Sequence, residues 1–245
     1  MLSKKLLRAS SRYHLSPAAD SNSSDLVLAC PFNSNFGLSD MSPIIRGSGD
    51  SHTLGPYGSS TSTIDTADYK FYGSSLKAGN RGGSSQRVTV EDFAGFDSGD
   101  FTVEYWIKVP DFGSQSFSPV WYQDNSNNGF NNTINFVNPS VYGEIGVFVN
   151  GTSVCKSLTQ ITANTWSHVA IERYGSYIYI YHDGSHVSQQ QFAISGSVTA
   201  NTALALLTGF DNTQSTTRMQ DLRIYVGVAK YTGGATPKPP GAMFT

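Results

Sequence analysis

Apolar and polar residues alternate along much of this chain, and this alternation predicts β-strands. In FTVEYWIKV (101–109), the apolar side chains at the odd positions share one face, and the even positions place Thr, Glu, Trp and Lys on the other. A strand with one buried face has this period of two. WSHVAIERY (166–174) and YIYIYH (177–182) alternate in the same way and are joined by Gly175-Ser176. They are predicted to form a hairpin.

Two further dipeptides predict tight turns. Asn150-Gly151 and Asp183-Gly184 lie between β-rich runs, where their tolerance of positive φ suits hairpin turns. With a two-residue turn at 183–184, His182 and His186 point to opposite faces, which argues against a shared metal. Many short strands with short turns predict an all-β, two-sheet antiparallel jelly-roll sandwich. Its further strand candidates are residues 26–30, 86–90, 119–122, 133–137, 144–150, 203–208 and 219–226.

Three segments lack this alternation. Residues 1–24 form a polar, basic N-terminal arm, residues 33–70 are predicted to be a long irregular loop region, and residues 233–245 are a Gly/Pro-rich tail. The remaining length suits one large all-β domain at residues 25–232. Terminal arms stay disordered unless something holds them, so we expect both arms to pack against neighbouring subunits or other proteins of an assembly. The candidate assembly residues are Lys4, Lys5, Arg8, Arg12, Tyr13, Pro239 and Pro240.

Composition narrows the classes of partner. Charged residues are 14% of the chain, against roughly 25% in an average globular domain, a mixture that suits extracellular or virion surfaces. The formal net charge of −2 provides no strong field for nucleic acid, so none is expected as a partner. No run is apolar enough for a secretory signal or a transmembrane helix, and no membrane partner is expected. Cys30 and Cys155 lack metal-ligand spacing and are predicted to be buried free thiols.

The acidic residues do not form a catalytic pattern. Retaining glycosidases need two carboxylates about 5–5.5 Å apart, which alternate positions of one strand provide. Here Glu91 and Asp92 are adjacent and point to opposite faces, and Glu104 is alone on its strand. Glu172 shares a face with His168, as a solvated surface pair, without a second acid. No G-x-S-x-G nucleophile turn occurs either, so we expect no enzymatic activity.

Five segments of the chain carry motifs in a fixed order. They are DLVLACPFN (25–33), GSSLKAGNRGGSSQRVTV (73–90), GDFTVEYWIKV (99–109), NTWSHVAIERYGSYIYIYHDGSHV (164–187) and MQDLRIYVGVAKYTGGATPKPP (219–240). Together they resemble a laminin-G-like, concanavalin-A-like jelly-roll domain over most of residues 25–240. The ending is particularly similar to the versions found in bacteriophage and marine viral structural proteins.

The resemblance implies two kinds of site. Laminin-G-like domains often hold Ca²⁺ at the sandwich rim, and the acids that match such a position are Asp97, Asp100, Asp211 and Asp221. Glycan binding is the other implied activity, because sugar faces stack on exposed aromatic rings beside hydrogen-bonding side chains. Its best candidate is the segment 121–138, with the residues Trp121, Tyr122, Asn127, Phe130 and Asn132. Tyr177, Tyr179 and Tyr181 form a second aromatic stripe, which we expect to be packed or covered.

Two functions follow from these expectations. The first is a virion structural protein, a capsid decoration or cement protein or a tail-associated component, located in the virion and bound to other virion proteins and to itself. Extended arms suit this role because they contact neighbours over large areas. The second is a carbohydrate-binding adhesin or receptor-binding module that recognises host surface polysaccharide.

Overall fold

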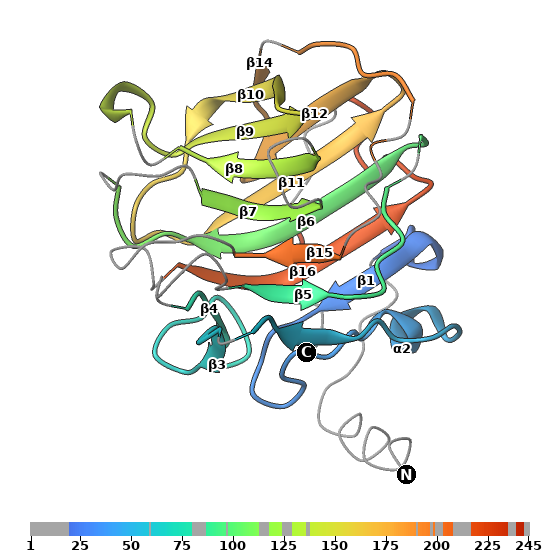
Figure 1. The fold of residues 1–245 in the computed structure, drawn as a ribbon, viewed down its shortest axis with the longest axis vertical. Helices are drawn as coiled ribbons and strands as arrows, with labels where there is room; N and C mark the ends of the chain where they lie inside the picture. Colours follow the sequence, from blue (N-terminus) through green and yellow to red (C-terminus); the bar gives the residue numbers. More distant parts are fainter. Residues whose placement is uncertain are drawn as a thin grey trace.

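The computed structural model describes residues 20–58, 60–79, 87–96, 98–112, 118–123, 129–135, 138–189, 191–196, 198, 203–207, 217–234 and 239–242. The described chain forms two antiparallel eight-stranded sheets, which confirms the predicted all-β sandwich (Figure 1). The short helical turns are η2 (Ser23–Asp25), α2 (Ser42–Arg46) and η3 (Pro139–Val141). No helix among the described residues is both long and apolar enough to span a bilayer.

The first sheet, named the β6 sheet here, contains strands from both ends of the described chain. In spatial order it is β13 (Ser185–His186), β12 (Tyr177–His182), β11 (Ser167–Tyr174), β6 (Phe101–Lys108), β16 (Arg218–Val226), β4 (Ser75–Lys77) and β3 (Thr63–Asp65), and β1 (Leu26–Cys30) also pairs with β16. The blue β1 and the red β16 lie side by side in Figure 1.

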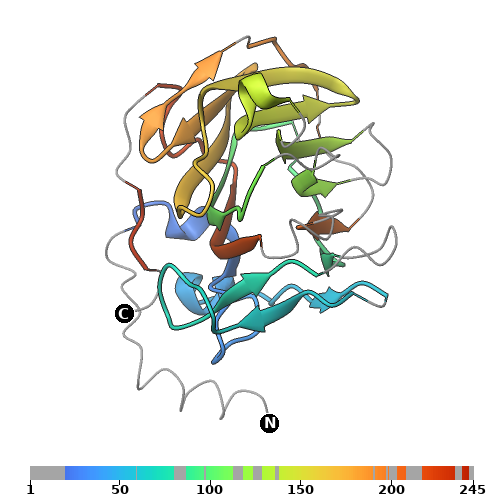
Figure 2. The same cartoon turned by 90° about the vertical axis from the view of Figure 1, so that its left-hand side faces the viewer.

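The second sheet, named the β8 sheet, comes mostly from the middle of the chain. In spatial order it is β14 (Ser188–Gln189), β10 (Thr152–Gln160), β9 (Glu144–Val149), β8 (Phe130–Ile134), β7 (Ser118–Gln123), β15 (Leu204–Leu206), β5 (Val88–Val90) and β2 (Leu54–Pro56). The cyan and teal segment with β2 to β4 lies at the bottom of the molecule in the side view of Figure 2.

An aromatic cluster between the sheets joins them. The ring of Phe96 has its centroid 4.8 Å from Phe101 on β6, 5.6 Å from Trp121 on β7 and 5.1 Å from Phe130 on β8. All four side chains are at most 1% exposed. Buried aromatic rings of this size contribute strongly to core packing, so this cluster fixes which face of β7 and β8 points inward.

The predicted turns and hairpin are confirmed. β11 pairs with β12 across Gly175-Ser176. Residues 150–151 and 183–184 all have positive φ, between 46° and 82°, as tight hairpin turns require. His182 pairs with Ser185 and Tyr181 with His186, so the two imidazoles lie on opposite faces as expected. Both cysteines are buried free thiols, also as predicted.

One structural expectation is wrong, and a second holds except for three short elements. β6 was expected to have one solvated face, but every residue from Phe101 to Ile107 is buried and only Lys108 is partly accessible. The reason is that residues 68–72 and the segment after β16 cover its outer face, where Lys70 lies over Trp106 and Lys230 reaches Glu104. The region 33–70, expected to be irregular, contains α2, β2 and β3.

Two glycines with positive φ provide a test of this packing. A Cβ at Gly143 (φ +81°) would lie 2.3 Å from the backbone oxygen of Ile161, whereas a Cβ at Gly175 (φ +60°) would meet nothing within 4 Å. We expect Gly175→Ala to lower the free energy of unfolding by about 1 kcal/mol, from backbone strain alone. Gly143→Ala should lower it by roughly 3 kcal/mol because a steric clash is added. If urea unfolding shows that both variants lose the same free energy of unfolding, the close packing of Gly143, after η3, against Ile161, after β10, is contradicted.

Candidate functional site

A row of side chains crosses the outer face of the β8 sheet. Asn131 on β8 pairs with Tyr122 on β7 and with Phe148 on β9, and Phe148 pairs with Ser153 on β10. Side chains of directly opposite residues on one face lie about 5 Å apart. All four are partly exposed. They form one continuous surface strip, which we call the aromatic row.

The ring of Phe148 lies along the sheet. A Cβ added at Gly146, two residues earlier on the same strand, would lie 3.1 Å from Cε2 and 3.8 Å from Cζ of Phe148. The ring therefore occupies the space above Gly146 that a larger residue would fill. Phe148 is partly exposed, so part of this ring is accessible to a ligand on the outer face of the sheet.

The aromatic row is open over four strands. Beyond Tyr122 the same row continues to Ala205 and Thr89, which are only 2% and 3% exposed. From β7 to β10 it spans three strand spacings, about 14 Å. Within the described part of the chain, the side-chain polar atoms of Tyr122, Asn131 and Ser153 form no hydrogen bond. They are available to a ligand.

Three of the predicted glycan-binding residues lie inside the sandwich, and for them the prediction is wrong. Trp121 is 1% exposed, and Phe130 and Asn132 are 0% exposed. The segment was interpreted as a loop, but its two ends are the strands β7 and β8, whose alternation turns these residues inward. Asn132 accepts a hydrogen bond from Tyr105 Oη and donates one to the Gly146 carbonyl at 3.0 Å. Tyr122 remains on the open face, and Asn127 lies outside the described residues.

Substitution of neighbouring residues on β7 distinguishes the core from the open face. Trp121→Ala should lower the free energy of unfolding by about 3–5 kcal/mol, because it removes a large side chain from the aromatic cluster. Tyr122→Ala should lower it by less than about 1 kcal/mol, because this ring is partly in solvent. Urea unfolding of both variants measures the difference. A Trp121→Ala protein as stable as wild type would show that Trp121 is not in the core.

Asp100 and Asp221, the two acids predicted for calcium that the structure describes, are engaged by other partners. Asp221 is buried, lies 3.2 Å from Arg223 Nη2 and accepts a hydrogen bond from Tyr72 Oη at 2.9 Å. Asp100 accepts the backbone N–H of Gly175 at 2.8 Å. The described residues contain no group of three or more His, Cys, Asp or Glu side chains placed to hold a metal. Asp97 and Asp211 lie outside the described residues, so their part in calcium binding stays a prediction.

The described part of the C-terminal tail lies against its own domain. Pro239 and Pro240 are half-buried, and Arg223 Nη2 donates a hydrogen bond to the Gly241 carbonyl at 2.9 Å. The N-terminal candidates lie outside the described residues: Lys4, Lys5, Arg8, Arg12 and Tyr13. A role of either arm in assembly stays a prediction.

The outer face of the β6 sheet holds a buried polar cluster around Glu104. Lys230 Nζ lies 2.8 Å from the carboxylate, Tyr231 Oη donates a hydrogen bond to it, and His168 Nε2 lies 3.8 Å away. Burial alone would raise the pKa of Glu104, but the positive charges of Lys230 and Arg223 outweigh it and hold this pKa at about 2. The carboxylate is therefore ionised and paired.

Glu172, on the neighbouring strand, holds the same C-terminal segment by its backbone. It accepts the N–H of Tyr231 at 2.6 Å, the N–H of Gly233 at 2.9 Å and the hydroxyl of Tyr181 at 3.2 Å. Desolvation raises the pKa of Glu172 even so. The surface pair predicted for His168 and Glu172 is wrong, because both side chains are 0% exposed.

Sequence reasoning missed this cluster. Glu104 and Lys230 are 126 positions apart, and no local motif joins them. The feature that points to it is the acid in the middle of an otherwise apolar strand, since such a side chain is buried only with partners. Because both Glu104 and Glu172 are 0% exposed, the cluster is structural and offers no carboxylate to a substrate.

The burial of His168 gives a prediction about pH. Burial lowers the pKa of this ring from 6.5 to about 4, because a desolvated imidazole resists protonation. Between these pH values the unfolded chain binds a proton that the folded protein does not, so the stabilising effect present above pH 6.5 is lost on acidification towards pH 4. The loss attributable to His168 is on the order of 3 kcal/mol.

The test is urea unfolding as a function of pH. Between pH 6.5 and pH 4, the free energy of unfolding should fall less in His168→Gln than in wild type. The comparison variant His186→Gln changes an exposed imidazole and should keep most of the wild-type fall. If His168→Gln leaves the pH dependence unchanged, the ring is not held neutral by burial.

Comparison with known proteins agrees with this geometry. Two twisted antiparallel sheets packed on an aromatic core define a β-sandwich of the jelly-roll class. The family model for laminin-G-like domains described as the concanavalin A-like lectin/glucanases superfamily matches residues 81–229, and the chain belongs to this superfamily. The laminin-G-like part of the sequence resemblance is thus confirmed. No curated protein sequence matches the chain.

Solved structures of similar fold include toxin binding domains. The binding domain of Paraclostridial Mosquitocidal Protein 1 superposes with a TM-score of 0.63 at 15% identity, covering 86% of this chain and 51% of that one. The binding domain of botulinum neurotoxin DC, in complex with SialylT, gives 0.61 at 12% identity, covering 85% and 49%. The binding domain of botulinum neurotoxin serotype D superposes with a TM-score of 0.59 at 16% sequence identity, covering 88% of this chain and 50% of that one. The chain spans about half the length of these structures, and such low identity shows the fold alone.

Proposed function

We propose that this protein is a carbohydrate-binding module whose ligand lies on the aromatic row. The observation that carries the proposal is the ring of Phe148, which extends over Gly146 and is partly exposed on the outer face of the sheet. Sugar rings present apolar C–H faces that pack on such rings, while their hydroxyls need directional partners. Asn131, directly opposite Phe148, and Tyr122 beyond it provide an amide and a phenol next to the ring.

The charges around the aromatic row favour an uncharged saccharide. Tyr122, Asn131, Phe148 and Ser153 carry no formal charge. The acidic residue of β9 is Glu144, whose Oε1 lies 3.5 Å from Lys156 Nζ on β10. Within the strands β7 to β10, the charges of Glu144 and Lys156 therefore cancel, and no net charge of these strands attracts or repels an ionic ligand at the centre of the row.

Binding without hydrolysis is the activity we propose. The superfamily's description includes glucanases, whose chemistry needs a pair of accessible carboxylates. The two carboxylates that share a sheet face, Glu104 and Glu172, are buried under the C-terminal segment. The similar solved structures are described as binding or receptor-binding domains, which supports a binding role for a domain of this shape.

A glycan array tests the proposal. Wild-type protein should give signal with particular uncharged oligosaccharides, and Phe148→Ala and Tyr122→Ala should each weaken the affinity for those glycans by roughly tenfold, because each removes a stacking surface. Isothermal titration with the best array ligand measures the change.

Two further variants sharpen the result. Tyr177→Ala removes a ring that is 43% exposed but lies on the other sheet, and it should bind glycan like wild type. Gly146→Ala changes none of the four residues of the aromatic row but displaces the Phe148 ring slightly, because the added Cβ would lie 3.1 Å from its Cε2 atom, and it should weaken binding less than Phe148→Ala does. An array without signal, or variants at Phe148 and Tyr122 that bind normally, would contradict the proposal.

The setting of this activity is a separate proposal. A virion surface, with other virion proteins as partners and host surface polysaccharide as ligand, is compatible with a glycan-binding module, since such a module attaches a particle to a cell. The support for it is the low charged fraction, 14%, and the similarity of the C-terminal motif to viral structural proteins.

A further inference from the structure

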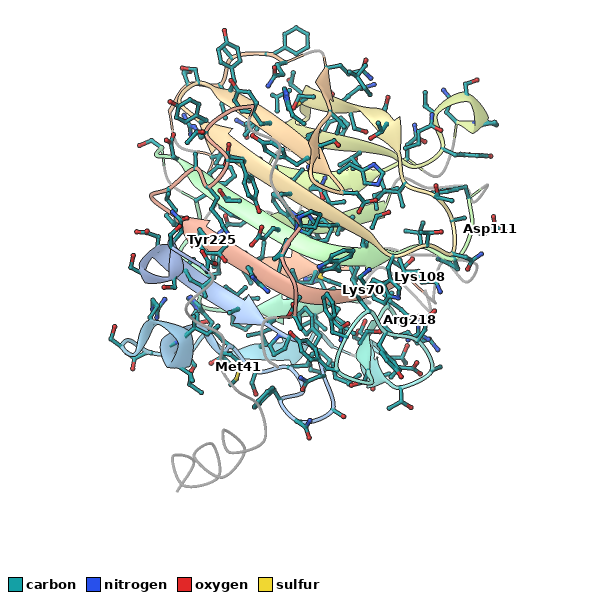
Figure 3. All side chains as sticks on the ribbon, turned by 180° about the vertical axis from the view of Figure 1, so that it is seen from behind. Met41, Lys70, Lys108, Asp111, Arg218 and Tyr225 are labelled. Atoms are coloured by element: carbon teal, nitrogen blue, oxygen red, sulfur yellow. The ribbon has the colours of Figure 1, made fainter. Side chains whose placement is uncertain are left out.

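A row of positive charges crosses one end of the outer face of the β6 sheet. Lys108 on β6 pairs with Arg218 on β16, Arg218 pairs with Lys77 on β4, and Lys77 pairs with Thr63 on β3. Opposite residues of one face are neighbours, so three cations lie side by side and end at the exposed Thr63. Lys108 and Lys77 are partly exposed, whereas Arg218 between them is only 6% exposed. We call these four residues the basic row. Lys108 and Arg218 are labelled close together in Figure 3.

A fourth cation borders the basic row. Lys70 Nζ lies 4.0 Å from the centroid of the Trp106 ring, which stands two positions before Lys108 on the same face of β6. The backbone N–H of Lys70 donates to Gln220 Oε1 on β16 at 2.9 Å. The contact with the Trp106 ring holds the exposed ammonium group of Lys70 over the outer face of β6, and Figure 3 labels Lys70 near Lys108 and Arg218.

Only two acids compensate these four cations. Asp65 lies 2.6 Å from Arg218 Nη1, and Asp68 lies 2.5 Å from Lys108 Nζ. Among the residues that the structure describes, neither Lys70 nor Lys77 has a carboxylate within ion-pair distance. Asp111, beyond the end of β6, accepts its neighbour's N–H instead.

This arrangement is unusual for the chain as a whole. Like charges placed directly opposite each other destabilise a sheet, and the protein has a formal net charge of −2. Here four cations and two acids nevertheless leave two surplus positive charges on one small surface. Such local excess raises the concentration of anions near it.

Aromatic side chains lie next to the cations. Tyr69, adjacent to Lys70 in the chain, is 48% exposed. Trp166 is half-buried and donates its Nε1–H to Asp68 Oδ1 at 3.1 Å, which holds the indole beside the Lys108 pair. A surface with cations, an open phenol ring and an exposed hydroxyl suits a ligand that carries both anionic groups and sugar rings.

We propose that the basic row, with Lys70 and Tyr69, is a second binding site, for an anionic saccharide that carries sulfate or carboxylate groups. The row spans three strand spacings, about 14 Å, so it accommodates several charges of one linear chain. The basic row lies on the β6 sheet, whereas the aromatic row lies on the β8 sheet. The two binding proposals are therefore tested independently.

Titration with dextran sulfate, carboxymethyl dextran and uncharged dextran of equal length tests this site. Wild type should bind at least one of the two charged polymers more tightly than the uncharged one, and this difference should shrink as salt is raised, because exposed charges are screened. The double variant Lys70→Ala/Lys77→Ala should bind about tenfold more weakly, since it removes the two cations without ion pairs. Lys70→Arg/Lys77→Arg keeps both charges and should bind like wild type.

A single variant controls for net charge. Lys156→Ala removes one positive charge from the other sheet, where it is paired with Glu144, and should leave the affinity unchanged. The proposal is overturned if wild type binds neither charged polymer, or if Lys156→Ala weakens binding as much as the double alanine variant. Binding of phosphatidylserine vesicles without binding of either polymer would also overturn it, in favour of a membrane surface.

Discussion

The ionised carboxylate of Glu104 joins both ends of the described chain to the middle of the sandwich. A buried charge is costly unless it is paired and hydrogen-bonded, and here the partners are Lys230 and Tyr231 from the segment after the last strand. Lys230 also reaches Asp20, 3.3 Å away at the start of the described chain. Removal of any one partner would leave the others buried and unpaired, so this segment is held as a fixed part of the β6 sheet. The outer face of this sheet is therefore closed at its centre and open to ligands only at its end.

The inner face of the other sheet decides where the aromatic row lies. Trp121 and Phe130 are turned inward by their contacts with Phe96, and because side chains alternate along a strand, Tyr122 and Asn131 must then point outward. A shift of one residue in either strand would bury the row and expose the core. The candidate ligand surface is thus a consequence of core packing, and it needs no loop to hold it in place.

Local sequence patterns correctly predicted the structural features that depend on residues close together in the chain. The hairpin of β11 and β12, the turn at Asp183-Gly184 and the opposite placement of His182 and His186 all follow from period and turn chemistry. The features that were missed depend on partners far away in the chain. The aromatic rim was expected at Trp121 and Phe130 because an Asn-rich segment reads as a loop, although both residues lie in strands. The basic row needs the registers of four strands, which single-strand patterns do not contain.

The two proposed surfaces differ because the chain treats the two sheets differently. The β8 sheet leaves its outer face free from β7 to β10, where mostly uncharged side chains face solvent. The β6 sheet receives the chain ends, and both the Lys230 ammonium paired with Glu104 and the backbone N–H groups bound to Glu172 belong to that covering segment. Its uncovered end retains the cations Lys77 and Lys70. Packed sheets lie about 10 Å apart, so the surfaces face opposite directions with the whole sandwich between them. A short saccharide cannot reach both, and a protein that uses both surfaces would bridge two separate glycan chains.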